Sequence, residues 1–222
     1  MTSANNPAHD LTRLRTIFGA ALTSDVLDHL GYRNQVLKSD VSMISGDGVM
    51  MGYAFPVRLE VVDSYPEVPY VGLLAALDAI QKDQVYVTPS SRMKRAALWG
   101  ELLSTACAFK GVAGALTDGP IRDLSRTDAM GFKVFATGTL PVDINGRYEV
   151  VEHNVSCEID GVTINPGDLI VGDNDGVTIV PVAAIDAVVE AVIEKNSGEN
   201  LFRKAVKEGM SPSAAFAKYG VL

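Results

Sequence analysis

One stretch decides the fold: residues 99–123, which read WGELLSTACAFKGVAGALTDGPIRD. The apolar spacing from Met93 to Lys110 predicts a helix, and Gly111 ends it, because glycine is preferred just past a helix C-terminus. The short apolar run from Val112 to Thr117 is typical of a buried strand. Asp118-Gly119-Pro120 then predicts a turn, so the stretch has the order helix, strand, turn.

The same alternation continues on both sides of this stretch. Before it, the residue pattern predicts a strand over 49–62, a helix over 70–80 and a strand over 84–88. After it, a helix over 124–130 and a strand over 133–136 are expected. Strands that alternate with helices favour a parallel sheet, because parallel neighbours need a crossover connection.

The two ends of the chain have a different character. Helices are expected over 11–18 and from a cap at Thr23 or Ser24 to Gly31, and again from Pro181 and from Ser211-Pro212. Between them, short strands joined by Gly, Asp and Asn turns predict an antiparallel section (148–159, 162–164, 169–171 and 177–180). The sequence therefore predicts one α/β domain over 1–222, with a parallel central sheet, a second antiparallel strand layer and flanking terminal helices, the C-terminal ones in 182–222.

The composition is that of an acidic globular protein. The chain has 222 residues, 19 Lys and Arg against 27 Asp and Glu, and a formal net charge of −8. Nucleic-acid binders normally carry a basic bias, so no nucleic-acid partner is expected. Residues 1–10 lack the apolar core that is typical of a signal peptide. No run of 18 apolar residues occurs, so no membrane span is expected. With only Cys107 and Cys157 and no CxxC, we expect a reducing compartment, the cytoplasm.

The residues at both ends of the deciding stretch can carry chemistry. A helix turn that begins at Gly100 directs free N–H groups at one spot, where a carboxylate or phosphate binds. Arg122 can bind an oxyanion through two N–H groups, and Asp123 offers a hard oxygen ligand for Mg²⁺. A structural reading stays open beside this one. Asp118-Gly119 is a frequent turn pair, Arg122-Asp123 can be a surface ion pair, and Glu101 can compensate the helix dipole.

These motifs together resemble a known family. Trp99-Gly100-Glu101-Leu102-Leu103, Gly111-Val112-Ala113-Gly114 and Asp118-Gly119-x-x-Arg122-Asp123 resemble the regulator of ribonuclease activity A-like family, and the likeness extends over about residues 22–181. Further matching segments are Ser24 to Gly31, Asn165-Pro166-Gly167-Asp168 and Gly172 to Val177. The family includes class II 4-hydroxy-4-methyl-2-oxoglutarate aldolases that also decarboxylate oxaloacetate, and proteins once labelled demethylmenaquinone methyltransferases.

The resemblance implies a swivelling β/β/α fold that assembles as a homotrimer or homohexamer with active sites at subunit interfaces. It implies that the amides of Gly100, Glu101, Leu102 and Leu103 hold the carboxylate of pyruvate. Arg122 would contact the carbonyl oxygen, and Asp123 would bind Mg²⁺ or Mn²⁺. The expected activity is a metal-dependent lyase reaction: retro-aldol cleavage of a 4-hydroxy-2-oxo dicarboxylate, with oxaloacetate decarboxylation as a side activity.

Two further acids and a second function belong to the same resemblance. The aldolases use acidic residues of a neighbouring subunit, and Asp25 and Glu199 are the candidates here, although Asp25 stands where glutamate is expected. The alternative function is a noncatalytic ring that docks on a ribonuclease, as the namesake of the family does. A methyltransferase is disfavoured, because no glycine-rich loop follows the first strand with an acidic residue placed for a ribose.

Overall fold

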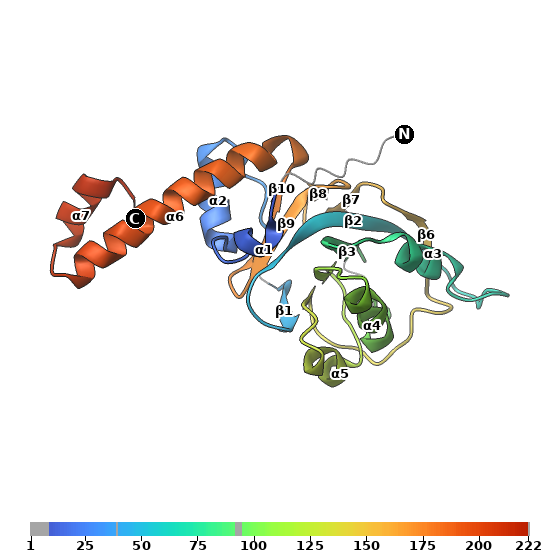
Figure 1. Cartoon of the computed structure of the whole chain (residues 1–222). Helices are drawn as coiled ribbons and strands as arrows, with labels where there is room; N and C mark the ends of the chain where they lie inside the picture. The colour runs from blue at the N-terminus through green and yellow to red at the C-terminus, as the bar shows by residue number, and fades with distance from the viewer. Residues whose placement is uncertain (1–8, 39, 92–94, 222) are drawn as a thin grey trace.

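The computed structural model describes residues 9–38, 40–91 and 95–221, and a curled mixed sheet forms its centre (Figure 1). The sheet order is β1-β5-β4-β3-β2-β9-β10, with β6 also paired to β2. Four adjacent strands run parallel, as the alternating pattern predicted: β2 (Met50–Val61), β3 (Gln84–Thr88), β4 (Gly114–Thr117) and β5 (Val134–Ala136).

The long strand β2 joins the parallel part to the antiparallel part. Its first residues pair with β9 (Leu169–Asp173), its middle with β3, and its last five residues with β6 (Tyr148–His153). The hairpin partner of β9 is β10 (Gly176–Val180), and β1 (Ser42–Ser45) closes the other edge against β5. A separate antiparallel hairpin is formed by β7 (Cys157–Ile159) and β8 (Val162–Ile164).

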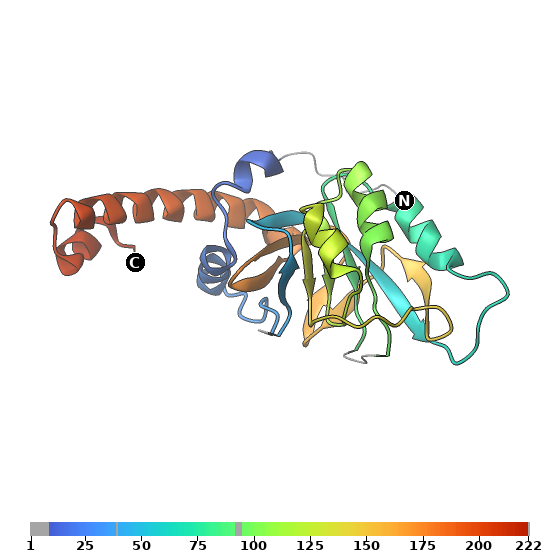
Figure 2. The ribbon, with the colours of Figure 1, turned by 90° about the horizontal axis from the view of Figure 1, so that it is seen from below.

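Alternate residues of the central strands face two different cores, as the two-residue period of a strand requires. On one face, Tyr86 and Ala115 pack under α3 (Val71–Ala79), α4 (Glu101–Phe109) and α5 (Leu124–Ala129). On the other face, Val85 and Leu116 pack against residues of the β7–β8 hairpin. Figure 2 shows α3, α4 and α5 side by side on their face of the sheet.

The terminal helices pack on the β9–β10 end of the sheet. The short α1 (Leu11–Leu14), α2 (Ala20–His29) and the first half of α6 (Ile185–Lys207) share one apolar core there. The rest of α6 projects away from the sheet, and α7 (Pro212–Tyr219) folds back along it (Figures 1 and 2). Among the residues that the structure describes, no helix has the length and apolar character that a membrane crossing requires.

The mixed α/β class with flanking helices is confirmed, and three helix starts differ from the prediction. Helix α4 begins at Glu101 rather than Met93, which lies outside the described residues, as do its neighbours 92 and 94. Helix α2 begins at Ala20, because the Asp173 carboxylate accepts its first N–H at 2.8 Å, a cap supplied from β9. A 3₁₀ turn (Val182–Ala184) separates Pro181 from α6.

Candidate active site at the start of helix α4

The first turn of α4 presents unpaired backbone N–H groups. Gly100 precedes the helix in an extended conformation, and no described side chain caps the first turn. The Ser104 N–H donates to the Gly100 carbonyl at 3.0 Å, which leaves the N–H groups of the first turn without a partner inside the helix. Trp99 Nε1 donates to Ser104 Oγ at 2.8 Å, and this bond fixes the indole beneath the turn.

The chain that leaves β4 turns back toward this helix start. Asp118 is 2% exposed, and its Oδ1 accepts the Ser90 N–H at 2.5 Å, which ties the end of β4 to the segment after β3. A Cβ on Gly119 would lie only 2.8 Å from Leu98 Cδ1, so a larger residue would displace the buried Leu98 side chain. The motif aspartate at 118 therefore has a structural role, as the turn interpretation indicated.

Two backbone hydrogen bonds hold the two motifs together. Leu98 N–H donates to the Pro120 carbonyl at 2.9 Å, and Arg122 N–H donates to the Trp99 carbonyl at 3.0 Å. As a result, Arg122 and Asp123 lie directly over Gly100. A Cβ at Gly100 would lie 3.2 Å from both Arg122 Cγ and Asp123 Oδ2, so the glycine keeps this approach open.

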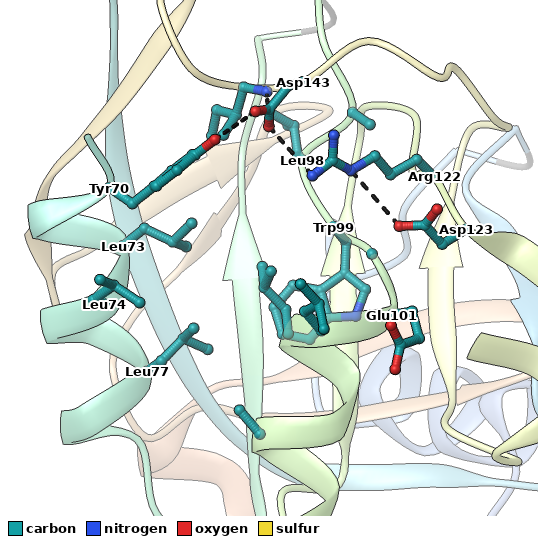
Figure 3. A pocket seen from close by; sticks show the side chains of 16 residues that line it. Tyr70, Leu73, Leu74, Leu77, Leu98, Trp99, Glu101, Arg122, Asp123 and Asp143 are labelled. Carbon is teal, nitrogen blue, oxygen red and sulfur yellow. Dashed lines mark hydrogen bonds and ion pairs between the residues drawn. The ribbon is translucent and has the colours of Figure 1, made fainter. Parts of the chain in front are cut away.

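The guanidinium of Arg122 lies between two carboxylates, as Figure 3 shows. Its Nε is 3.7 Å from Asp123 Oδ2, and its Nη2 is 3.4 Å from Asp143 Oδ1. Tyr70 Oη donates to the other oxygen of Asp143 at 2.5 Å. This hydrogen bond, and then burial, raise the pKa of Tyr70 above its ordinary value, so the phenol stays protonated at neutral pH.

These groups line a pocket of about 320 Å³ between α3 and α4 (Figure 3). One end is polar, with the start of α4, Arg122 and three carboxylates. The opposite wall is apolar and comes mainly from α3. The lining residues that carry charge are Glu101, Arg122, Asp123 and Asp143, and the apolar wall includes Leu73, Leu74, Leu77, Leu103 and Ala106. The arrangement suits a small acid that has a carboxylate at one end.

The donor set at Asp123 fits a hard divalent cation. Asp123 adopts a left-handed conformation (φ 56°) in front of α5, yet its side chain does not cap that helix. Its carboxylate lies at the pocket instead, 47% exposed. The described residues contain no cluster of three or more His, Cys, Asp or Glu side chains with metal-binding spacing. A single carboxylate suits Mg²⁺, which keeps several of its waters.

The structure thus brings Gly100 to Leu103 together with Arg122 and Asp123, as the motifs predicted. Within one chain it does not bring Asp25 or Glu199 to them. Asp25 on α2 pairs with Lys195 on α6 at 2.5 Å, and Glu199 lies 3.8 Å from Arg203 within α6. Their role in a neighbouring subunit remains a prediction.

Two polar residues of the pocket were not predicted from the sequence. Tyr70 lies before α3, and Asp143 lies in the loop between β5 and β6. Neither belongs to a motif, and Asp143 is one of eight acidic residues between Leu140 and Gly176. No signal in a single sequence distinguishes it from the others.

Comparison with known proteins gives the family. The family model described as RraA-like, Aldolase/RraA, matches residues 20–179. The chain therefore belongs to the RraA-like family, the one that its motifs resemble.

Three proteins show how this chain relates to known ones. It is 28% identical to a Halalkalibacterium halodurans protein named "Putative 4-hydroxy-4-methyl-2-oxoglutarate aldolase", over 93% of this chain and 92% of that protein. Streptomyces coelicolor RraAS2, an unusual member of the RNase ES inhibitor RraA protein family, superposes with a TM-score of 0.76 at 26% identity, covering 87% of this chain and 96% of that one. A crystal structure from work on novel cellulases of gut-associated microbes superposes with a TM-score of 0.82 at 26% identity, and the match covers 90% of each chain.

Proposed function

We propose that the chain is a divalent-metal-dependent class II pyruvate aldolase. It cleaves a 4-hydroxy-2-oxo dicarboxylate, such as 4-hydroxy-4-methyl-2-oxoglutarate, to pyruvate and a second oxo acid, and decarboxylates oxaloacetate as a side activity. The observation that carries the proposal is one pocket in which the start of α4, Arg122 and Asp123 meet. The similarity to a protein named for this aldolase activity supports it.

Different residues of the pocket have different roles in the proposed reaction. The first-turn N–H groups from Gly100 to Leu103 bind the carboxylate next to the 2-oxo group. Arg122 donates to the 2-oxo oxygen and stabilises the negative charge that develops there. The C3–C4 bond breaks, its electron pair becomes the enolate of pyruvate, and a base takes the proton of the 4-hydroxyl group, whose oxygen becomes the carbonyl of the second oxo acid. Protonation of the enolate at C3 then gives pyruvate. Decarboxylation of oxaloacetate passes through the same enolate, with CO₂ as the leaving group and no such base.

Asp123 is the residue that would hold Mg²⁺ or Mn²⁺. When bound, the cation supplies Lewis-acid polarisation of the 2-oxo group. Arg122 Nε lies 3.7 Å from this carboxylate, so the guanidinium would face the same end of the substrate as a cation held there.

We also propose that the active form is a homotrimer or homohexamer in the cytoplasm, with the pocket completed by a neighbour that supplies Asp25 or Glu199. Exposed apolar side chains on α3 and α4 support an interface on this face: Leu74 and Leu102, which line the pocket, are 55% and 72% exposed, and Phe109 at the end of α4 is 94% exposed. An exposed apolar patch of this kind marks an interaction site.

A coupled pyruvate-release assay tests the aldolase. The purified chain is given 4-hydroxy-4-methyl-2-oxoglutarate or oxaloacetate, with Mg²⁺ or with a chelator. We expect turnover of both substrates that is lost on chelation and regained with added metal. If neither substrate shows metal-dependent turnover, the proposed aldolase activity is wrong.

A second candidate is a ring that binds and regulates a ribonuclease. The fold likeness to RraAS2, a member of an RNase ES inhibitor family, favours it. The net charge of −8 would complement a basic RNA-binding region of such a partner. The test is inhibition of a purified ribonuclease by the purified chain. Inhibition that persists in Arg122→Ala would assign the docking function to a surface outside the pocket, and lack of inhibition counts against this candidate.

A further inference from the structure

The carboxylate of Asp143 lies beside the guanidinium of Arg122, and both of its oxygens accept further hydrogen bonds. Its Oδ1, which lies 3.4 Å from Arg122 Nη2, accepts the N–H of Ile144 at 2.7 Å. Its Oδ2 accepts the Tyr70 hydroxyl at 2.5 Å. Arg147 donates to the Asp143 carbonyl at 3.2 Å and so fixes the backbone as well. The carboxylate therefore has a set position, and it faces Arg122.

The hydrogen bond to Asp143 also helps to position Tyr70. Tyr70 adopts a left-handed conformation (φ 64°, ψ 12°) directly before α3, which is strained for an aromatic residue. Its ring lies between the main pocket and a second hollow of about 210 Å³, and it lines both. With space on two sides of the ring, the short bond to Asp143, with a side-chain hydrogen bond to Asn145 beside it, holds the phenol at the pocket.

The two carboxylates beside Arg122 differ in what else they can do. Asp123 is the proposed cation ligand, so its charge would be shared with a bound metal. Asp143 is already committed to Tyr70 and Ile144, and its negative charge remains directed at Arg122. At 3.4 Å and 3.7 Å, neither carboxylate takes up the guanidinium in a short bidentate pair. The guanidinium is held in place, and its N–H groups remain able to bind a substrate oxygen.

We propose that Asp143 and Tyr70 are positioning residues, which hold the Arg122 guanidinium where it meets the developing negative charge on the 2-oxo oxygen. Tyr70 acts through Asp143, and Asp143 acts through Arg122. The proposal rests on the proposed function, because the oxygen that Arg122 meets is that of the 2-oxo acid. It assigns a role to a loop and a helix start that the motifs of the sequence do not contain.

Three variants and two controls test this chain of contacts. Asp143→Asn removes the charge and keeps the shape, Tyr70→Phe removes only the hydroxyl group, and the third variant combines them. Asp186→Asn and Tyr53→Phe make the same chemical changes on α6 and β2, at residues that do not line the pocket; Asp186 pairs with His9 at 2.8 Å. Pyruvate release is measured as kcat and KM for each, and melting temperatures confirm folding.

The expected result is a change in kcat with little change in KM. Removing a partner that orients an active group costs on the order of 10- to 100-fold, and we expect this for Asp143→Asn and about 10-fold for Tyr70→Phe. KM should change less than threefold, because α4 still binds the carboxylate. The double variant should match Asp143→Asn alone, since Tyr70 acts through it, and Asp143→Glu should recover part of the loss.

Other outcomes would overturn the positioning role. If the wild type turns over substrate and both single variants keep its kcat, or if their losses multiply in the double variant, the role is wrong. If Asp143→Asn does not fold, Tyr70→Phe carries the test alone. A wild type without turnover refutes the proposed function, and the positioning is then judged by the crystal structure of Asp143→Asn. An Arg122 side chain displaced in that variant supports it, and an unmoved one contradicts it.

Discussion

The backbone N–H of Arg122 donates to the carbonyl oxygen of Trp99 at 3.0 Å, which joins the residue before Gly100 to the residue before Asp123. Through this bond, two motifs that are 23 positions apart present their groups to one pocket. The helix start supplies donors for a carboxylate, and the turn after β4 supplies a guanidinium and a carboxylate. A substitution in either motif is therefore expected to shift the groups of the other motif.

Arg122→Ala should lower kcat/KM for pyruvate release by roughly 10²- to 10³-fold, the usual cost of losing one donor to a developing oxyanion. Arg122→Lys should reduce kcat/KM less than Arg122→Ala, because lysine keeps the positive charge and lacks only the planar, two-pronged donor group of arginine. Arg58→Ala is the control, since Arg58 pairs with Glu60 and Glu152 away from the pocket. Full activity in Arg122→Ala would remove this residue from the mechanism.

Gly100→Ala tests the close approach over the helix start. The added Cβ would lie 3.2 Å from Arg122 Cγ and from Asp123 Oδ2, so both must shift by a few tenths of an ångström. The backbone is extended at Gly100, so alanine fits it without strain. We expect kcat/KM to fall about 10-fold through misplacement of the reacting groups, with the melting temperature nearly unchanged.

Gly19→Ala is the matched control, since Gly19 also precedes a helix in an extended conformation and its Cβ would meet Asp173 Oδ2 at a comparable 3.0 Å, outside the pocket. Equal activity of both alanine variants would show that the space above Gly100 has no part in the reaction.

Asp123→Asn should weaken the binding of Mn²⁺ or Mg²⁺ at least tenfold, because a hard cation loses its charged oxygen ligand. Isothermal titration calorimetry measures this without substrate. Asp175→Asn, in the exposed turn between β9 and β10, serves as the control. If the metal affinity is the same in Asp123→Asn as in the wild type, the cation is held elsewhere.

The two thiols should be inert in the folded chain. Burial raises the pKa of Cys107 and of Cys157 to about 12. At pH 8 neither should react with a disulfide reagent such as DTNB, whereas two thiols should react after unfolding. Rapid labelling of one thiol in the native chain would contradict this prediction.

The same shift sets a pH dependence of stability. The unfolded chain loses its thiol protons near pH 8.5 to 9, while the folded chain keeps them to about pH 12. Stability from these groups is present below that window and falls as the pH rises through it, by up to about 1.4 kcal/mol per pH unit and thiol. Denaturation midpoints between pH 8 and 10 measure the slope, which Cys107→Ala should lessen.

Most of the parallel part of the fold could be predicted from local pattern. The strand expected over 84–88 is β3, and the helix over 70–80 is α3, because each has an apolar pattern bounded by clear turn residues. The predicted helix from Met93 to Lys110 is wrong over residues 95–100, which are not helical. Ala96, Ala97, Leu98 and Trp99 are all at most 5% exposed, buried in a non-helical segment that pairs with Pro120, Arg122 and Val142. A fully buried apolar run looks the same in a helix and in an extended segment.

The motif part of the site could also be predicted, and the supporting part could not. Gly100, Arg122 and Asp123 carry a recognisable pattern, and the structure places them at one pocket. Tyr70 and Asp143 reach that pocket only through tertiary packing, from a helix start and a loop 73 positions apart. The cap of α2 by Asp173 was missed for the same reason, because both partners look ordinary in the sequence.

The most direct test of the account is a crystal of the wild-type chain soaked with pyruvate and Mg²⁺. We predict density for pyruvate with its carboxylate at the N–H groups of Gly100 to Leu103, its carbonyl oxygen at Arg122, and a cation at Asp123. Pyruvate bound in another part of the molecule, with the pocket at Arg122 empty, would contradict the central claim.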